Sequence, residues 1–76
     1  MEFRDAAETV LREEGRPLHW TVVQDLALKR GYLDPFTQPD IRTHLLRALA
    51  DAVAAGAVVK TDKGMYALAE PGGSAP

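Results

Sequence analysis

The spacing of apolar residues predicts an amphipathic helix at the start of the chain. Five apolar side chains recur at helical intervals and would share one face: Phe3, Ala6, Ala7, Val10 and Leu11. The charged residues between them lie largely on the other face, and Gly15 is placed to end the helix. Because Pro17 prevents helical continuation, residues 18–20 are expected to form a short extended segment.

A second helix is expected to start at Thr21. Thr21 and Gln24 have the spacing of a capping box, in which each side chain satisfies a free backbone N–H of the first turn. Gly31 can supply a left-handed stop, after two basic residues that suit the negative end of the helix dipole. The apolar residues that would face the core are Val22, Val23, Leu26 and Ala27.

The longest helix is predicted after a loop at residues 32–37, whose three large apolar side chains are expected to pack rather than lie in solvent. Thr37 and Asp40 repeat the capping spacing, and the helix would run to about Ala55, before Gly56. With a rotation of about 100° per residue, five apolar residues would form a single stripe along this helix: Ile41, Leu45, Leu46, Leu49 and Val53. The residues that would face away from it are Asp40, Thr43, His44, Arg47 and Asp51.

After Gly56 the helical spacing gives way to two short strand-like runs. They flank Asp62, Lys63 and Gly64, and Gly64 can adopt the positive φ of a three-residue hairpin loop. Helix, extended segment, helix, loop, helix and hairpin follow one another in the order of a winged helix-turn-helix, an α+β fold. Since a lone hairpin is marginally stable, the extended segment at residues 18–20 is expected to pair with it, giving a small two- to three-stranded antiparallel sheet.

Length and composition limit what such a domain can be. Seventy-six residues support one modest core, assigned to residues 1–70, while residues 71–76 have nothing to bury and are expected to be a flexible tail or linker. The chain has no Cys, which excludes disulfides, thiolate zinc sites and cysteine nucleophiles. With no apolar run long enough to cross a bilayer and a charged start, the chain is expected to be cytoplasmic and away from membranes.

The sequence offers little for catalysis or for cofactors. His19 and His44 lie on different predicted elements, and neither has a third ligand at a suitable spacing, so a metal site is not expected. Ser74 lies in the predicted tail, and no glycine-rich phosphate loop precedes a helix. We therefore expect no enzyme activity, no metal and no cofactor.

Two motifs carry a resemblance to a known family. The run "GRPLHW" at residues 15–20, within "AAETVLREEGRPLHWTVVQDLALKRG", and the hairpin sequence "VVKTDKGMYAL" resemble the HARE-HTH domains, which are similar to the N-terminal domain of the bacterial RNA polymerase delta subunit. The resemblance covers nearly all of residues 3–70. It implies a winged helix in a transcription, chromatin or restriction context, with contact to DNA.

Charge gives a local rather than a global indication of nucleic-acid binding. Nine Lys and Arg against eleven Asp and Glu leave a net charge of −2, which is not typical of a phosphate-binding domain. Residues 37–69, however, contain four basic and three acidic residues, a balance of +1. The first hypothesis is weak, salt-sensitive binding of double-stranded DNA through the third helix and the wing, by Arg42, Thr43, His44, Arg47, Lys60 and Lys63.

The same residues also have purely structural interpretations. Arg47 and Asp51 are four residues apart and could simply form an ion pair, and the stem of Arg42 could lie along the apolar stripe. The competing functional hypothesis is a protein-docking module that holds RNA polymerase or a fused effector through an acidic or apolar face. The acidic residues of the first helix that motivate it are Glu8, Glu13 and Glu14.

Overall fold

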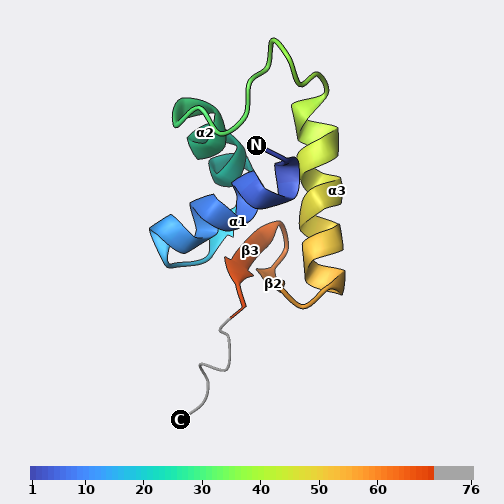
Figure 1. Ribbon diagram of the computed structural model, residues 1–76. Helices are drawn as coiled ribbons and strands as arrows, with labels where there is room; N and C mark the ends of the chain where they lie inside the picture. Colours follow the sequence, from blue (N-terminus) through green and yellow to red (C-terminus); the bar gives the residue numbers. More distant parts are fainter. Residues whose placement is uncertain (70–76) are drawn as a thin grey trace.

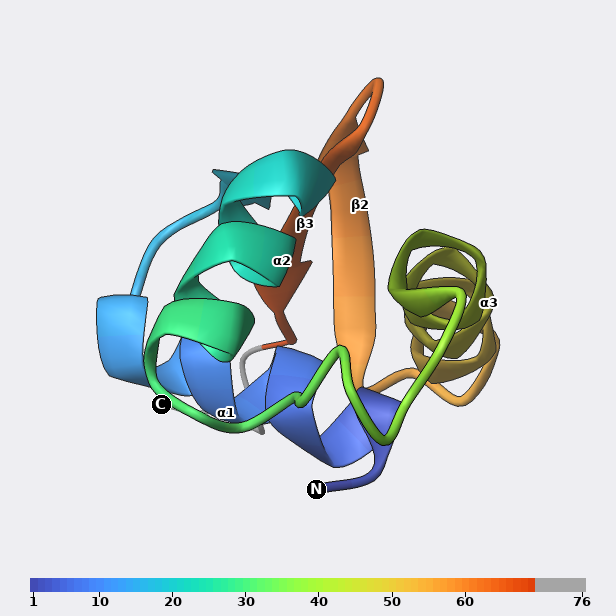
Figure 2. The ribbon, with the colours of Figure 1, turned by 90° about the horizontal axis from the view of Figure 1, so that it is seen from above.

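Residues 1–69, which the computed structural model describes, form three helices and one three-stranded antiparallel sheet (Figure 1). The predicted α+β, winged-helix-like arrangement is therefore confirmed, while the tail predicted at residues 71–76 lies outside the described residues. In chain order the elements are α1 (Phe3–Glu14), β1 (Leu18–His19), α2 (Trp20–Lys29), α3 (Ile41–Ala54), β2 (Val58–Asp62) and β3 (Met65–Leu68). Seen from above in Figure 2, the hairpin of β2 and β3 rises between α2 and α3.

The segment before α2 joins the hairpin, as predicted. The strand order is β1-β3-β2, and Leu18 of β1 pairs with Tyr66 while His19 pairs with Met65. The backbone N–H of Trp20 extends the contact by donating to the carbonyl of Gly64 at 2.9 Å. The strand is one residue shorter than expected, because Trp20 already belongs to α2.

The hairpin itself forms around Gly64, which has the predicted positive φ of 71°. Asp62 pairs with Met65, so two residues connect the strands instead of the expected three. The register shifts between Lys60 and Asp62, and the Asp62 carboxylate accepts a hydrogen bond from the backbone N–H of Lys63 at 2.7 Å. The wing, which consists of β2, β3 and the turn between them, is thus a short ribbon whose strand register is irregular just before the turn.

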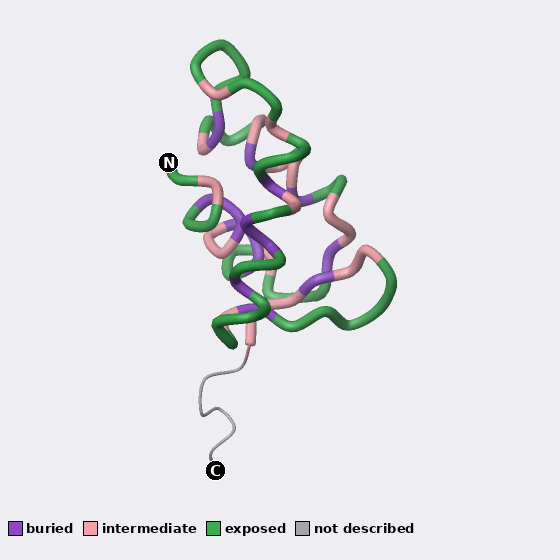
Figure 3. The backbone as a smooth tube through the Cα atoms, turned by 90° about the vertical axis from the view of Figure 1, so that its right-hand side faces the viewer, coloured by how far each residue is buried: buried purple, intermediate pink, exposed green. Residues whose placement is uncertain are grey.

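The core lies where the three helices meet the inner face of the sheet. The buried stretches are purple in Figure 3, whereas the loop before α3 is mostly exposed. Small residues on α1 and α3 allow these two helices to approach closely. The apolar face predicted for α1 is confirmed, although Phe3 is only partly buried. The core residues are Ala6, Ala7, Val10, Leu11, Leu18, Val23, Ala27, Leu33, Leu45, Leu49, Ala52, Val58 and Tyr66.

The capping box predicted for α2 is wrong. His19 is the N-cap residue, and its ring Nδ1 accepts a hydrogen bond from the backbone N–H of Thr21 at 3.3 Å. Extended backbone continues through His19 because this residue is still paired in the sheet, so Thr21 falls inside the helix. The Gln24 Oε1 atom is buried and has no hydrogen-bond partner among residues 1–69. Val22, predicted to be buried, is 39% exposed.

The predicted start of α3 is also wrong, although its end near Gly56 is confirmed. The backbone N–H groups of Thr37 and Gln38 both donate to the carbonyl of Asp34, so these residues form a turn and α3 begins only at Ile41. Asp40 stands at the N-cap in the left-handed region, with φ of 53° and no capping hydrogen bond from its side chain. Val53, expected in the buried stripe, is exposed.

The loop before α3 packs only in part. Leu33 is buried and its backbone N–H donates to the carbonyl of Ala27, and Tyr32 is half-buried. Phe36, in contrast, is 95% exposed, which corrects the expectation that it packs. The turn that Asp34 makes with Thr37 and Gln38 lifts Phe36 away from the core.

Candidate nucleic-acid interface

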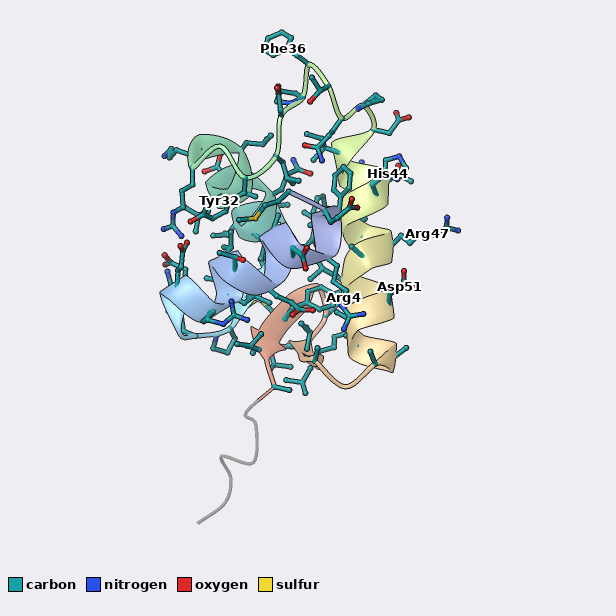
Figure 4. The ribbon with its side chains drawn as sticks, in the orientation of Figure 1. Arg4, Tyr32, Phe36, His44, Arg47 and Asp51 are labelled. Carbon is teal, nitrogen blue, oxygen red and sulfur yellow. The ribbon has the colours of Figure 1, made fainter. Side chains whose placement is uncertain are left out.

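Four of the predicted binding residues lie on α3 and are exposed to solvent. Arg42, Thr43, His44 and Arg47 are all exposed. Arg47 extends away from the helices, and Asp51 lies one turn further along (Figure 4). The predicted polar outer face of α3 is therefore confirmed for Thr43, His44 and Arg47, and Arg42, which was placed near the apolar stripe by its angle, is exposed as well.

Arg47 does not form the ion pair with Asp51 that its spacing allowed. Across residues 1–69 the ion pairs are Arg4–Glu8, Arg16–Glu14, Arg30–Glu13 and Arg30–Glu14. Arg42, Lys60 and Lys63 are absent from these pairs as well. The basic groups of α3 and of the wing are thus available to an external anion.

Arg42 is held over the ring of Trp20. Its guanidinium carbon lies 5.4 Å from the ring centroid, a cation–π distance. Stacking uses the flat face of the guanidinium and leaves its N–H edges free to donate. Neither the phosphate contact nor the stem along the apolar stripe that the sequence suggested for Arg42 indicated this stacking on Trp20.

Contacts through Trp20 connect Arg42 to the wing. The backbone N–H of Trp20 donates to Gly64, and its ring centroid lies 5.8 Å from that of His19. The hairpin turn that carries Lys63 is therefore hydrogen-bonded to the start of α2, where the ring of Trp20 contacts Arg42. Lys60 is exposed on β2, in register with Tyr66.

His44 is separated from this group. Its ring centroid lies 5.2 Å from that of Phe3, on the side of α3 that packs against α1. Each residue of a helix is turned by about 100° from the one before it. Arg42 and His44, two residues apart, therefore lie on nearly opposite sides of α3, with Thr43 between them. The structure thus links Arg42 to the hairpin through Trp20 and leaves His44 at the far margin of the exposed face.

Sequence reasoning missed the part that Trp20 plays in this surface. Trp20 was expected only as a bulky residue of the extended segment, whereas it is half-buried and supports the guanidinium of Arg42. The two residues are 22 positions apart, on different helices. No local pattern in the chain indicates such a contact.

Glu13 and Glu14, the acidic residues at the end of α1, are engaged within the chain. Arg30 donates to both Glu13 and Glu14 at 2.7 Å, and the Tyr32 hydroxyl also donates to Glu13. The hydrogen bond from Arg30 is the main reason that the pKa of Glu14 is lowered. The hydrogen bond to Glu13 raises the pKa of the Tyr32 phenol. This cluster ties the end of α1 to the end of α2 rather than offering a free acidic surface.

A second surface feature is an apolar groove of about 570 Å³ at the C-terminal end of α1. Val59 and Ala67 pair across the hairpin and alternate with Lys60 and Tyr66, so they line the sheet face opposite to the core. Arg12 and Arg16 supply positive charge beside the apolar lining. The remaining lining residues are Leu11, Gly15, Pro17, Leu68 and Ala69.

Within residues 1–69 no three His, Asp or Glu side chains gather as metal ligands, and no helix there is long and apolar enough to cross a membrane. Comparison of the chain with protein-family models, with curated proteins and with solved structures gave no match. The fold and the charged surface of α3 and the wing are therefore the observations from which a function can be argued.

Proposed function

We propose that this chain is a winged-helix DNA-binding domain that contacts double-stranded DNA through α3 and the wing. The observation that carries the proposal is that the basic side chains of α3 and the wing are exposed and form no ion pair within residues 1–69. These side chains are Arg42, Arg47, Lys60 and Lys63, whereas three of the other arginines are paired with carboxylates.

Each residue has a role that follows from its place. Thr43 and Arg47, on the outer face of α3, would meet base edges and phosphates in the major groove. Arg42 would donate to a phosphate with its orientation set by Trp20, and Lys60 and Lys63 would contact the adjacent backbone from the wing. His44, beside Phe3, would contribute only at the margin of the contact.

The binding would be weak and sensitive to salt. Four basic groups neutralise about four phosphates at most, which corresponds to a slope of about −4 in log K against log salt. A net charge of −2 adds no general attraction to the polyanion.

Fluorescence anisotropy of a labelled duplex at low salt tests the proposal. We expect Arg47→Ala and Lys63→Ala to weaken binding and to reduce the salt slope by about 1 each. Lys29→Ala is the matched control, because Lys29 is an exposed basic residue at the end of α2, away from α3 and the wing. Absence of binding even at low salt would exclude the proposal.

The resemblance to HARE-HTH domains supports a more specific context. On that basis we propose that the protein acts in the bacterial cytoplasm with DNA-associated machinery, without catalysis or a cofactor of its own. This step rests on the "GRPLHW" and "VVKTDKGMYAL" motifs alone.

The alternative function is a docking module for RNA polymerase or a fused effector. Since Glu13 and Glu14 are engaged by Arg30, this function would depend on the apolar groove rather than on an acidic face. A pull-down that recovers polymerase subunits after nuclease treatment would favour docking, and loss of all partners after nuclease would count against it.

A further inference from the structure

Phe36 is an aromatic side chain that the fold exposes on an ordered turn. It is 95% exposed and stands at the top of the molecule in Figure 4. Its backbone N–H donates to the Asp34 carboxylate at 2.9 Å, and the backbone N–H of Asp34 donates to the Gln38 side chain at 2.8 Å. The Gln38 amide in turn donates to the carbonyl of Met1. An aromatic ring on a turn already held in place loses little conformational entropy on binding and is typical of an interface anchor.

The apolar groove has the complementary properties. Its lining is mostly apolar, Val59 within it is 44% exposed, and its volume exceeds that of one phenyl ring. Charge also matches: the turn carries Asp34 and Asp40 with no basic residue, whereas the groove carries Arg12 and Arg16. Arg12 forms no ion pair within residues 1–69, and Arg16 approaches Glu14 only at 3.4 Å.

Phe36 cannot reach the groove of its own chain. Its turn is bonded to Met1, next to the start of α1, whereas the groove lies at the end of α1. The 12 residues of α1 separate the two sites by about 18 Å at a rise of about 1.5 Å per residue. A contact between Phe36 and this groove would therefore join two molecules.

We propose that the protein associates head to tail with a second copy of itself, with the Phe36 turn of one copy seated in the groove of the next. Because the two surfaces differ and lie at opposite ends, the association is heterologous and adds further copies instead of closing as a dimer. A single aromatic anchor buries a small interface, so the association is transient and depends on concentration.

Sedimentation velocity across about 10 μM to about 1 mM tests the proposal, because this range covers weak association. For the unmodified protein we expect an average mass that rises with concentration and falls again at high salt. Phe36→Ser and Val59→Glu should each abolish the rise. Their matched controls, Val22→Ser and Val53→Glu, change exposed apolar residues outside both surfaces and should leave it intact.

Mixing the two variants that do not self-associate gives the decisive result. Phe36→Ser keeps an intact groove and Val59→Glu keeps an intact Phe36, so the mixture should form 1:1 heterodimers and nothing larger. If Val59→Glu unfolds, Arg12→Glu serves as the groove variant, with retained folding checked by circular dichroism. Constant monomeric mass, as expected if residues 70–76 or another protein fills the groove, overturns the proposal. Association that survives either variant overturns it as well.

Discussion

Gly64 lies where the hairpin turn passes the ring of His19. A Cβ atom at Gly64 would lie 2.7 Å from His19 Nε2, and the φ of 71° is unfavourable for any residue with a side chain. The ring cannot move away freely, because it lies beside Trp20 and 2.8 Å from the hydroxyl of Thr21. The requirement for glycine here is therefore both conformational and steric.

We predict that Gly64→Ala lowers the free energy of unfolding by more than Gly15→Ala does. Both substitutions incur the left-handed penalty of about 1–2 kcal/mol, but a Cβ at Gly15 meets nothing within 4 Å. Urea unfolding of the two variants measures the difference. In a His19→Ala background the cost of Gly64→Ala should approach that of Gly15→Ala. Equal costs for the two glycine variants in the unmodified background would contradict the argument.

Glu14 gives a second prediction, which concerns pH. The hydrogen bond from Arg30 lowers the pKa of Glu14 below its ordinary value of 4.5. The ionised carboxylate therefore stabilises the fold fully above about pH 4.5, and this stabilisation is lost as the pH falls through the pKa that Glu14 has in the folded protein. Glu14→Gln should therefore unfold at lower urea than the unmodified protein at pH 7, and the gap should narrow below about pH 4.5. Glu2→Gln is the control, because the Glu2 side chain makes no capping hydrogen bond. A gap of the same size at pH 3 and pH 7 would contradict this account of the ion pair.

At the level of elements, the sequence predicts best what depends on local spacing. The apolar periodicity of α1, the end of α3 near Gly56 and the positive φ of Gly64 in the hairpin turn each follow from neighbouring residues, and all are confirmed, although the turn is one residue shorter than predicted. The starts of α2 and α3 could not be predicted in the same way. His19 replaces Thr21 as a cap because β3 holds it in an extended conformation, and pairing with a distant strand leaves no local signal.

The short strand β1 is the third strand of the sheet and joins the hairpin to the segment before α2. Leu18 is 2% exposed, pairs with Tyr66 and belongs to the core. Leu18→Ala should lower the free energy of unfolding by about 2–5 kcal/mol, as expected for a buried leucine. Val59→Ala, at an exposed position of β2, should cost much less. Chemical denaturation of both variants provides the comparison, and equally small losses would mean that β1 does not brace the sheet.

At the scale of the whole molecule, the candidate site was predictable as a set of exposed residues but not as an arrangement. The amphipathic pattern of α3 places Thr43 and Arg47 outward, as the structure confirms. It does not show that Arg42 stacks on Trp20 near the wing, or that His44 turns toward Phe3. Both contacts join helices that are distant in sequence, so only the packed fold determines them.

The proposed surfaces are also separate from one another. Lys60 lies on the core-facing side of the sheet, whereas Val59 in the groove lies on the opposite side. Head-to-tail association would therefore cover the Val59 face of the hairpin and leave its Lys60 face exposed. If both proposals hold, successive copies would present several weak DNA-binding surfaces at once, and the affinity for long duplexes would exceed that for short ones.

The most direct test of the central claim is an NMR titration of isotope-labelled protein with duplex DNA at low salt. We predict chemical shift changes that cluster at Arg42, Thr43, Arg47, Lys60 and Lys63, with the signals of Lys29 and Arg30 unchanged. The changes should disappear as salt is added, since phosphate contacts dominate the binding. No shift change at low salt, or changes confined to the groove around Val59, would contradict the assignment of α3 and the wing as a DNA-binding surface.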